Sequence, residues 1–79
     1  MRTIAQQWTS FEAAVVPAKA GRVQRMEMRR MFYAGFQAAL MSLMEAAGES
    51  DDEVQQVDNL QRLHDECRAF ARAVEAGKA

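Results

Sequence analysis

The sequence predicts an all-α fold, in which a short N-terminal helix packs on a long antiparallel helical hairpin within one domain, residues 1–79. Composition is the first reason: Ala, Met, Leu, Glu, Gln and Arg dominate, beside four glycines and one proline. These dominant residues lose little free energy on entering a helix. The second reason is periodicity, since apolar residues recur at spacings of three and four and no run alternates in the manner of a half-buried strand.

The first helix is predicted over residues 3–15. Ile4, Trp8, Phe11 and Val15 follow one another at spacings of four, three and four, which places them in one apolar stripe. Pro17 should end the helix, because a proline disfavours the α conformation in the residue before it. Large aromatic side chains dominate burial in a core of this size, so Trp8 and Phe11 should anchor the helix.

A second helix is predicted over residues 22–47, with Gly48 where a left-handed C-terminal cap is wanted. Its residues 31–44 carry no charge. This run is too apolar for an ordinary surface helix, yet it is shorter than the roughly 20 apolar residues of a membrane span. The second helix should therefore be covered by protein on most sides.

The third helix is predicted over residues 51–75. Ser50 and Glu53 have the spacing of a capping box, and Gly77 stands where the helix should end. A link as short as Gly48-Glu49 would force the second and third helices into an antiparallel hairpin. The apolar stripe of the third helix consists of Val54, Val57, Leu60, Leu63, Cys67, Phe70 and Val74.

Two apolar faces are expected on the second helix. The bulky face consists of Met26, Arg29, Tyr33, Phe36, Leu40, Leu43 and Ala47. The small-residue face consists of Met28, Met31, Gly35, Ala38, Ala39, Ser42 and Ala46. A first helix of about 20 Å covers only half of a second helix of about 39 Å. We therefore predict a homodimer whose interface contains Met28, Met31, Gly35, Ala38 and Ser42; the alternative is a monomer in which the first helix folds diagonally across this face.

Charge is divided between the two halves of the chain. Residues 1–40 contain six basic and two acidic side chains, a net charge of +4, whereas residues 41–79 contain four basic and nine acidic ones, a net charge of −5. The basic cluster consists of Lys19, Arg22, Arg25, Arg29 and Arg30. Such a cluster could contact phosphates, so a nucleic-acid-binding accessory protein is the alternative function. No recognition-helix motif or set of stacking aromatic residues accompanies the cluster, which makes this alternative the weaker one.

Few residues of the sequence could bind a metal or take part in catalysis. His64 and Cys67 are three residues apart, but a zinc site needs four protein ligands, or three and a water, and the chain contains no other Cys or His. Two such pairs could meet only across a dimer axis. A Cys-His nucleophile also needs an orienting group and an oxyanion donor, and no glycine-rich loop offers one. We predict a non-enzyme without cofactor or metal, in which Cys67 is a small apolar core residue and His64 lies at its boundary.

Features of the N-terminal segment and the single thiol predict the compartment. The opening MRTIAQQWTSFEA has no continuous apolar core and no small-residue cleavage site, so we expect no secretory signal. One cysteine cannot form an intramolecular disulfide and fits a reducing environment. The expected location is the cytoplasm, without membrane association.

One segment carries a resemblance. Residues 27–35, EMRRMFYAG, together with Trp8-Thr9-Ser10-Phe11 and Pro17, resemble a group of short helical proteins encoded in bacteriophages and prophages. The resemblance implies a phage origin, a small accessory role and the host cytoplasm, and it transfers no catalytic or binding residue. With the fold, it predicts a self-associating helical module that binds a host or phage protein.

Overall fold

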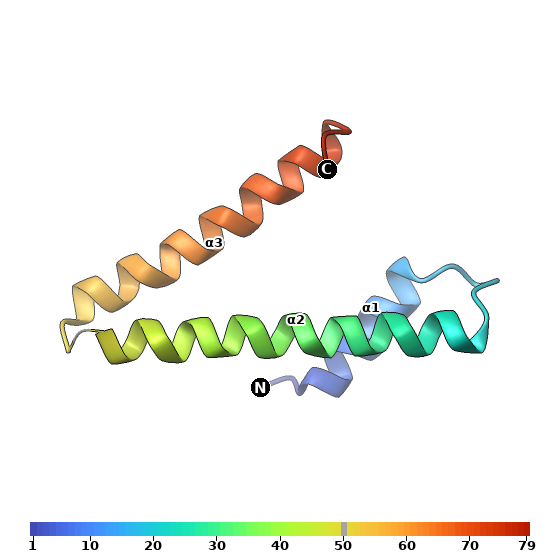
Figure 1. Cartoon of the computed structure of the whole chain (residues 1–79), viewed down its shortest axis with the longest axis horizontal. Helices are drawn as coiled ribbons and strands as arrows, with labels where there is room; N and C mark the ends of the chain where they lie inside the picture. Colours follow the sequence, from blue (N-terminus) through green and yellow to red (C-terminus); the bar gives the residue numbers. More distant parts are fainter. Residues whose placement is uncertain (50) are drawn as a thin grey trace. The chain divides into compact units, whose positions relative to one another are not determined.

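The computed structural model describes residues 1–49 and 51–79 of the chain. Within these residues it contains three α-helices, α1 (Ile4–Val15), α2 (Arg22–Glu49) and α3 (Glu53–Glu75), and no β-strand (Figure 1). The predicted all-α class is therefore confirmed. The chain forms two compact units, Met1–Leu40 (unit 1) and Met41–Ala79 (unit 2), whose boundary falls inside α2.

Helix α1 begins at a capping box that the sequence analysis did not identify. The Thr3 hydroxyl accepts a hydrogen bond from the Gln6 amide at 3.1 Å, and the Gln6 side chain accepts one from the Thr3 amide at 2.9 Å. Two of the unpaired donors at the helix N-terminus are satisfied in this way. At the other end Val16 is extended, as expected for the residue before Pro17, so the predicted end of the first helix is confirmed.

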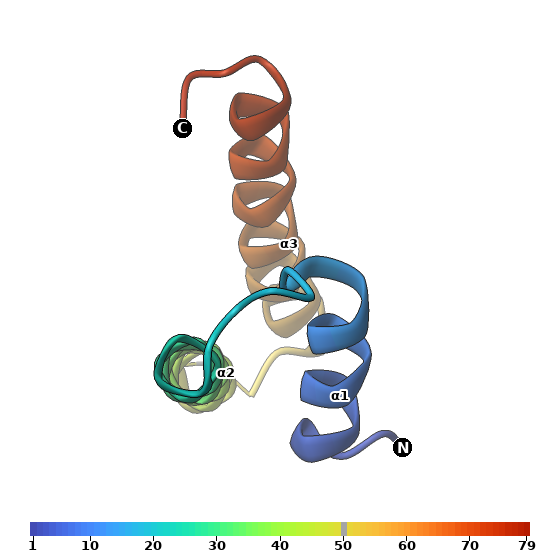
Figure 2. The ribbon, with the colours of Figure 1, turned by 90° about the vertical axis from the view of Figure 1, so that its right-hand side faces the viewer.

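An aromatic cluster forms the core of unit 1, where α1 crosses the first half of α2 (Figures 1 and 2). Trp8 is 7% exposed, and its ring centroid lies 5.9 Å from that of Phe11 and 5.5 Å from that of Phe32. Phe11 and Phe32 are 5.2 Å apart. The predicted anchors Trp8 and Phe11 are thus confirmed, and Phe32 is the side chain of α2 that receives them.

The end of α2 differs from the prediction. The helix continues through Gly48 to Glu49, and among the described residues only Gly77 has a positive φ angle. The prediction of a left-handed cap at Gly48 was wrong. A glycine inside a helix costs about 1 kcal/mol relative to alanine, which a helix of 28 residues tolerates without ending there.

Both ends of α3 are capped. The Asp52 carboxylate accepts a hydrogen bond from the Val54 amide at 3.0 Å, so the helix begins at Glu53, two residues after the predicted start. The predicted capping residue Ser50 lies outside the described residues. At the C-terminus Gly77 adopts φ +71°, and the amide of Lys78 donates to the Ala73 carbonyl at 2.8 Å. This Schellman arrangement confirms the predicted role of Gly77.

Candidate interaction surfaces

The predicted interface residues of α2 lie in three different environments. Met28 is half-buried beside Phe11 in unit 1, whereas Met31, Gly35 and Ala38 are exposed. A Cβ atom built at Gly35 would meet nothing within 4 Å. In unit 1, α1 packs against the neighbouring side of α2 through Phe32. The middle of the small-residue face is therefore open.

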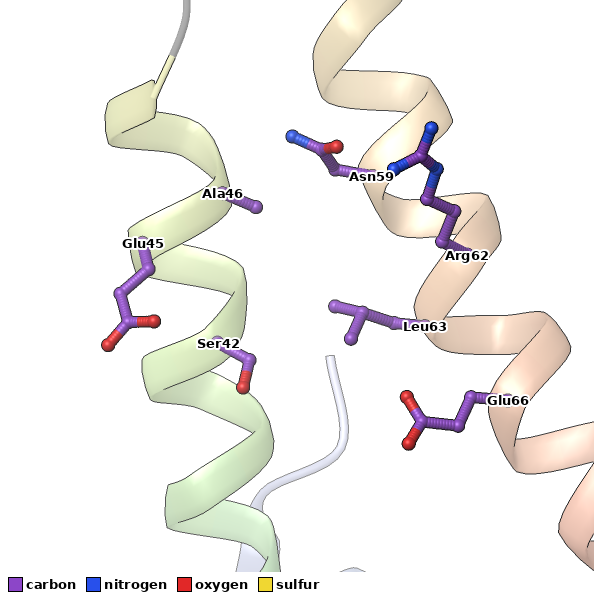
Figure 3. Close-up of a pocket in the computed structure, with 7 residues that line it drawn as sticks. All are labelled: Ser42, Glu45, Ala46, Asn59, Arg62, Leu63 and Glu66. Atoms are coloured by element: carbon purple, nitrogen blue, oxygen red, sulfur yellow. The ribbon is translucent and has the colours of Figure 1, made fainter.

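Ser42, the remaining predicted interface residue, lies in a groove of unit 2 between α2 and α3 (Figure 3). Ser42 and Ala46 point toward α3, and Asn59 and Leu63 point toward α2. The groove has a volume of about 200 Å³. This part of the small-residue face therefore faces α3, and its small side chains let the two helices approach each other.

Asn59 gives the groove a polar group that lacks part of its hydrogen bonding. Its side-chain oxygen accepts a hydrogen bond from the Gln55 amide group at 3.1 Å, whereas its side-chain nitrogen is buried without a hydrogen-bond partner. Leaving a buried donor unpaired costs about 1 to 3 kcal/mol. The helix contact at the groove therefore leaves one buried hydrogen-bond donor, the Asn59 side-chain nitrogen, without a partner.

Most of the apolar stripe of α3 is exposed. Val57, Leu60, Phe70 and Val74 each expose half or more of their surface. Cys67 is exposed as well, so its predicted place in the core was wrong, and His64 is also exposed. Length explains this, because α3 has 23 residues and the part of α2 in the same unit has only residues 41–49. Much of the stripe has no neighbour within unit 2.

Arg25, a predicted phosphate contact, is instead part of the connection between α1 and α2. Its guanidinium group donates hydrogen bonds to the carbonyl oxygens of Pro17 at 3.0 Å, Ala18 at 3.3 Å and Ala20 at 3.1 Å. It also forms an ion pair with Glu12, at 3.5 Å. The five donors of a guanidinium group suit such a set of carbonyl oxygens. Arg25 thereby holds the connector to the start of α2.

Two other members of the basic cluster, Arg29 and Arg30, line one hollow of α2 together with Met26 and Tyr33. The guanidinium carbon of Arg29 lies 5.6 Å from the centre of the Tyr33 ring, in a cation–π arrangement. Lys19, Arg22 and Arg30 are exposed. Apart from Arg25, the cluster therefore consists of four exposed cations, of which Arg29 stacks on Tyr33.

Within residues 1–49 and 51–79 no three His, Cys, Asp or Glu side chains lie together in a way that could hold a metal ion. Over the same residues, no helix has both the length and the apolar character that crossing a bilayer requires.

Comparison of the chain with protein-family models, curated proteins and solved structures gives no match. The open apolar surfaces of the two units are the features of the molecule that point to a function.

Proposed function

We propose that this protein is a self-associating helical module for protein–protein interaction. The observation that supports this is the small amount of apolar burial: among the described hydrophobic residues only Trp8 and Val16 are buried. Met31 is 69% exposed and Phe70 is 64% exposed. Burying apolar surface contributes about 25 cal/mol per Å², so these side chains would stabilise a complex that covers them.

The helical hairpin is part of this proposal. Leu63 and Asn59 of α3 already face Ser42 and Ala46 of α2 in unit 2. Small side chains such as these let helix axes come close. We therefore assign the part of the small-residue face around Ser42 and Ala46 to α3, within unit 2.

A biological role follows from the resemblance to small phage and prophage proteins. A module of this size without a closed core would act by occupying a host or phage protein in the host cytoplasm. Helical grooves recognise amphipathic helices through apolar anchors, and methionine side chains adapt to varied partners. Six methionines in 79 residues suit this mode of binding.

Self-association has a direct test. At micromolar concentration, light scattering should give twice the 8.9 kDa mass of one chain. The melting temperature should rise with protein concentration, because folding is then linked to association. A mass of one chain together with a melting temperature independent of concentration would contradict the proposal.

Gly35 tests the packing of the small-residue face. Because a Cβ atom at Gly35 meets nothing within 4 Å, Gly35→Leu and its matched control Gly35→Ala should both stabilise the helix, by up to about 1 kcal/mol. Urea unfolding followed by circular dichroism measures the change. A loss of stability of about 1 to 3 kcal/mol confined to the leucine variant would mean that another helix packs closely on this face.

Nucleic-acid binding is the alternative, and it is less well supported because Arg25 and Arg29 are engaged within unit 1. This alternative requires a mobility shift with DNA or RNA that decreases steeply as salt rises. We expect no salt-sensitive shift at micromolar protein. A shift lost in a Lys19→Ala, Arg22→Ala and Arg30→Ala triple variant would favour the alternative.

A further inference from the structure

Two adjoining hollows lie on one side of α2 in unit 1, and both are lined by Arg30 and Tyr33. The first is completed by Met26 and Arg29. The second, of about 500 Å³, is completed by Ile4, Ala34, Gln37 and Leu40. Met26 is 41% exposed and Leu40 is 48% exposed. Unit 1 thus presents a continuous, partly apolar surface along α2.

The residues of this surface have the spacing of a helix-pairing seam. Met26, Arg30, Tyr33, Gln37 and Leu40 follow one another at intervals of four, three, four and three. This alternation keeps side chains on the line where two helices supercoil around each other. We call these five residues the seam.

The seam lies beside the side of α2 that carries Phe32, and Ile4 of α1 borders its second hollow. In unit 1, α1 contacts α2 through Phe32. In unit 2, α3 faces Ser42, which lies about 140° around the helix axis from Gln37 at 3.6 residues per turn. The exposed side chains of the seam are therefore available to another chain.

The distribution of charge along α2 indicates a second copy of α2 as the partner and indicates the direction in which the two helices pair. Residues 22–35 of α2 contain four arginines and one glutamate, whereas residues 36–49 contain two glutamates and no basic residue. Two parallel copies of α2 would bring the arginine-rich halves together. Two antiparallel copies would instead place each arginine-rich half beside a glutamate-bearing half, which is the complementary arrangement.

We propose that the seam is the homodimer interface, and that α2 pairs there with α2 of a second copy in the antiparallel direction. This inference rests on the proposed self-association and assigns its surface. With the twofold axis near Gly35, Tyr33 of each copy lies opposite Gln37 of the other, and Arg30 lies opposite Leu40. The cation–π contact with Arg29 orients the Tyr33 ring at the seam.

A charge test at Leu40 distinguishes this arrangement from others. Leu40→Arg places a cation opposite Arg30 of the second copy and should raise the dimer Kd roughly tenfold or more. Leu40→Glu places an anion opposite Arg30, so its dimer should be much tighter than that of Leu40→Arg. Sedimentation equilibrium of both full-length variants gives the Kd values, with circular dichroism to verify folding. Val54→Arg and Val54→Glu are the matched controls, because Val54 is an exposed apolar residue on α3.

Spin labels then report the direction. With a nitroxide on Val23→Cys in a Cys67→Ser background, the two labels of an antiparallel dimer lie about 36 Å apart along the axis. In a parallel dimer the two labels lie at the same level along the axis, so their separation is set by the distance between the helix axes, roughly 10 Å. A long distance supports the proposal and a short one overturns it.

The outcomes separate this inference from the proposed function. If the wild type dimerises but the Leu40 variants behave like the Val54 controls, or if Arg and Glu at position 40 weaken the dimer equally, the seam assignment is wrong and self-association stands. If the wild type is monomeric, both proposals fail.

Discussion

Replacing Trp8 by alanine should destabilise unit 1 by about 3 to 5 kcal/mol, the cost observed when a large buried aromatic side chain is removed. Trp8 contacts both Phe11 and Phe32, so its loss opens a cavity between α1 and α2. Because few other side chains are buried in the described part of the chain, neighbouring residues can do little to compensate. We expect α1 to detach from α2 at room temperature.

The measurement is urea unfolding followed by circular dichroism, since this variant lacks the only tryptophan of the chain. Met31→Ala provides the control, because it shortens an exposed apolar side chain of the same unit and should change stability by less than about 0.5 kcal/mol. Equal effects of the two substitutions would show that Trp8 does not anchor α1.

Arg25→Ala should have the second largest effect, a loss of about 2 to 3 kcal/mol. The substitution removes three hydrogen bonds from a charged donor to the connector carbonyls, and hydrogen bonds to charged groups contribute about 1.5 to 3 kcal/mol. The ion pair with Glu12 is about one third exposed on both sides and adds little. Thermal unfolding followed by circular dichroism measures the loss.

Two further variants identify which feature of Arg25 matters. Arg25→Lys keeps the charge but cannot reach the three carbonyl oxygens with a planar group, so it should recover only a minor part of the lost stability. Arg22→Ala, a neighbouring exposed arginine, should be nearly neutral. Full recovery by lysine would mean that charge, and not the hydrogen-bond geometry, stabilises the connector.

Local signals made much of the fold predictable. Helix-forming composition, the stripe through Trp8 and Phe11, and punctuation by Pro17 and Gly77 each act within a few residues, where sequence and conformation are directly linked. Gly48 shows the limit of this reasoning: a glycine permits a left-handed cap but does not require one. The cap at Thr3 had a signal, Gln6 three residues later, that was overlooked.

The candidate surfaces were less predictable, because they depend on how helices meet. Phe32 lies between the two faces assigned to α2, although its spacing of four from both Met28 and Phe36 marks a ridge that could have indicated it. Arg25 was assigned to a phosphate site on charge alone. Its hydrogen bonds go to carbonyl oxygens of a connector whose path the sequence does not specify.

The division of the chain into two units has a consequence for spectroscopy. Trp8 and Tyr33, the only tryptophan and the only tyrosine, both belong to unit 1, so ultraviolet emission reports on that unit and not on residues 41–79. Circular dichroism at 222 nm records the helices of both units. If the two units unfold independently, the emission and dichroism transitions will separate, and if α2 transmits cooperativity across residue 40 they will coincide. A single unmodified sample therefore reports whether the long helix couples its two halves.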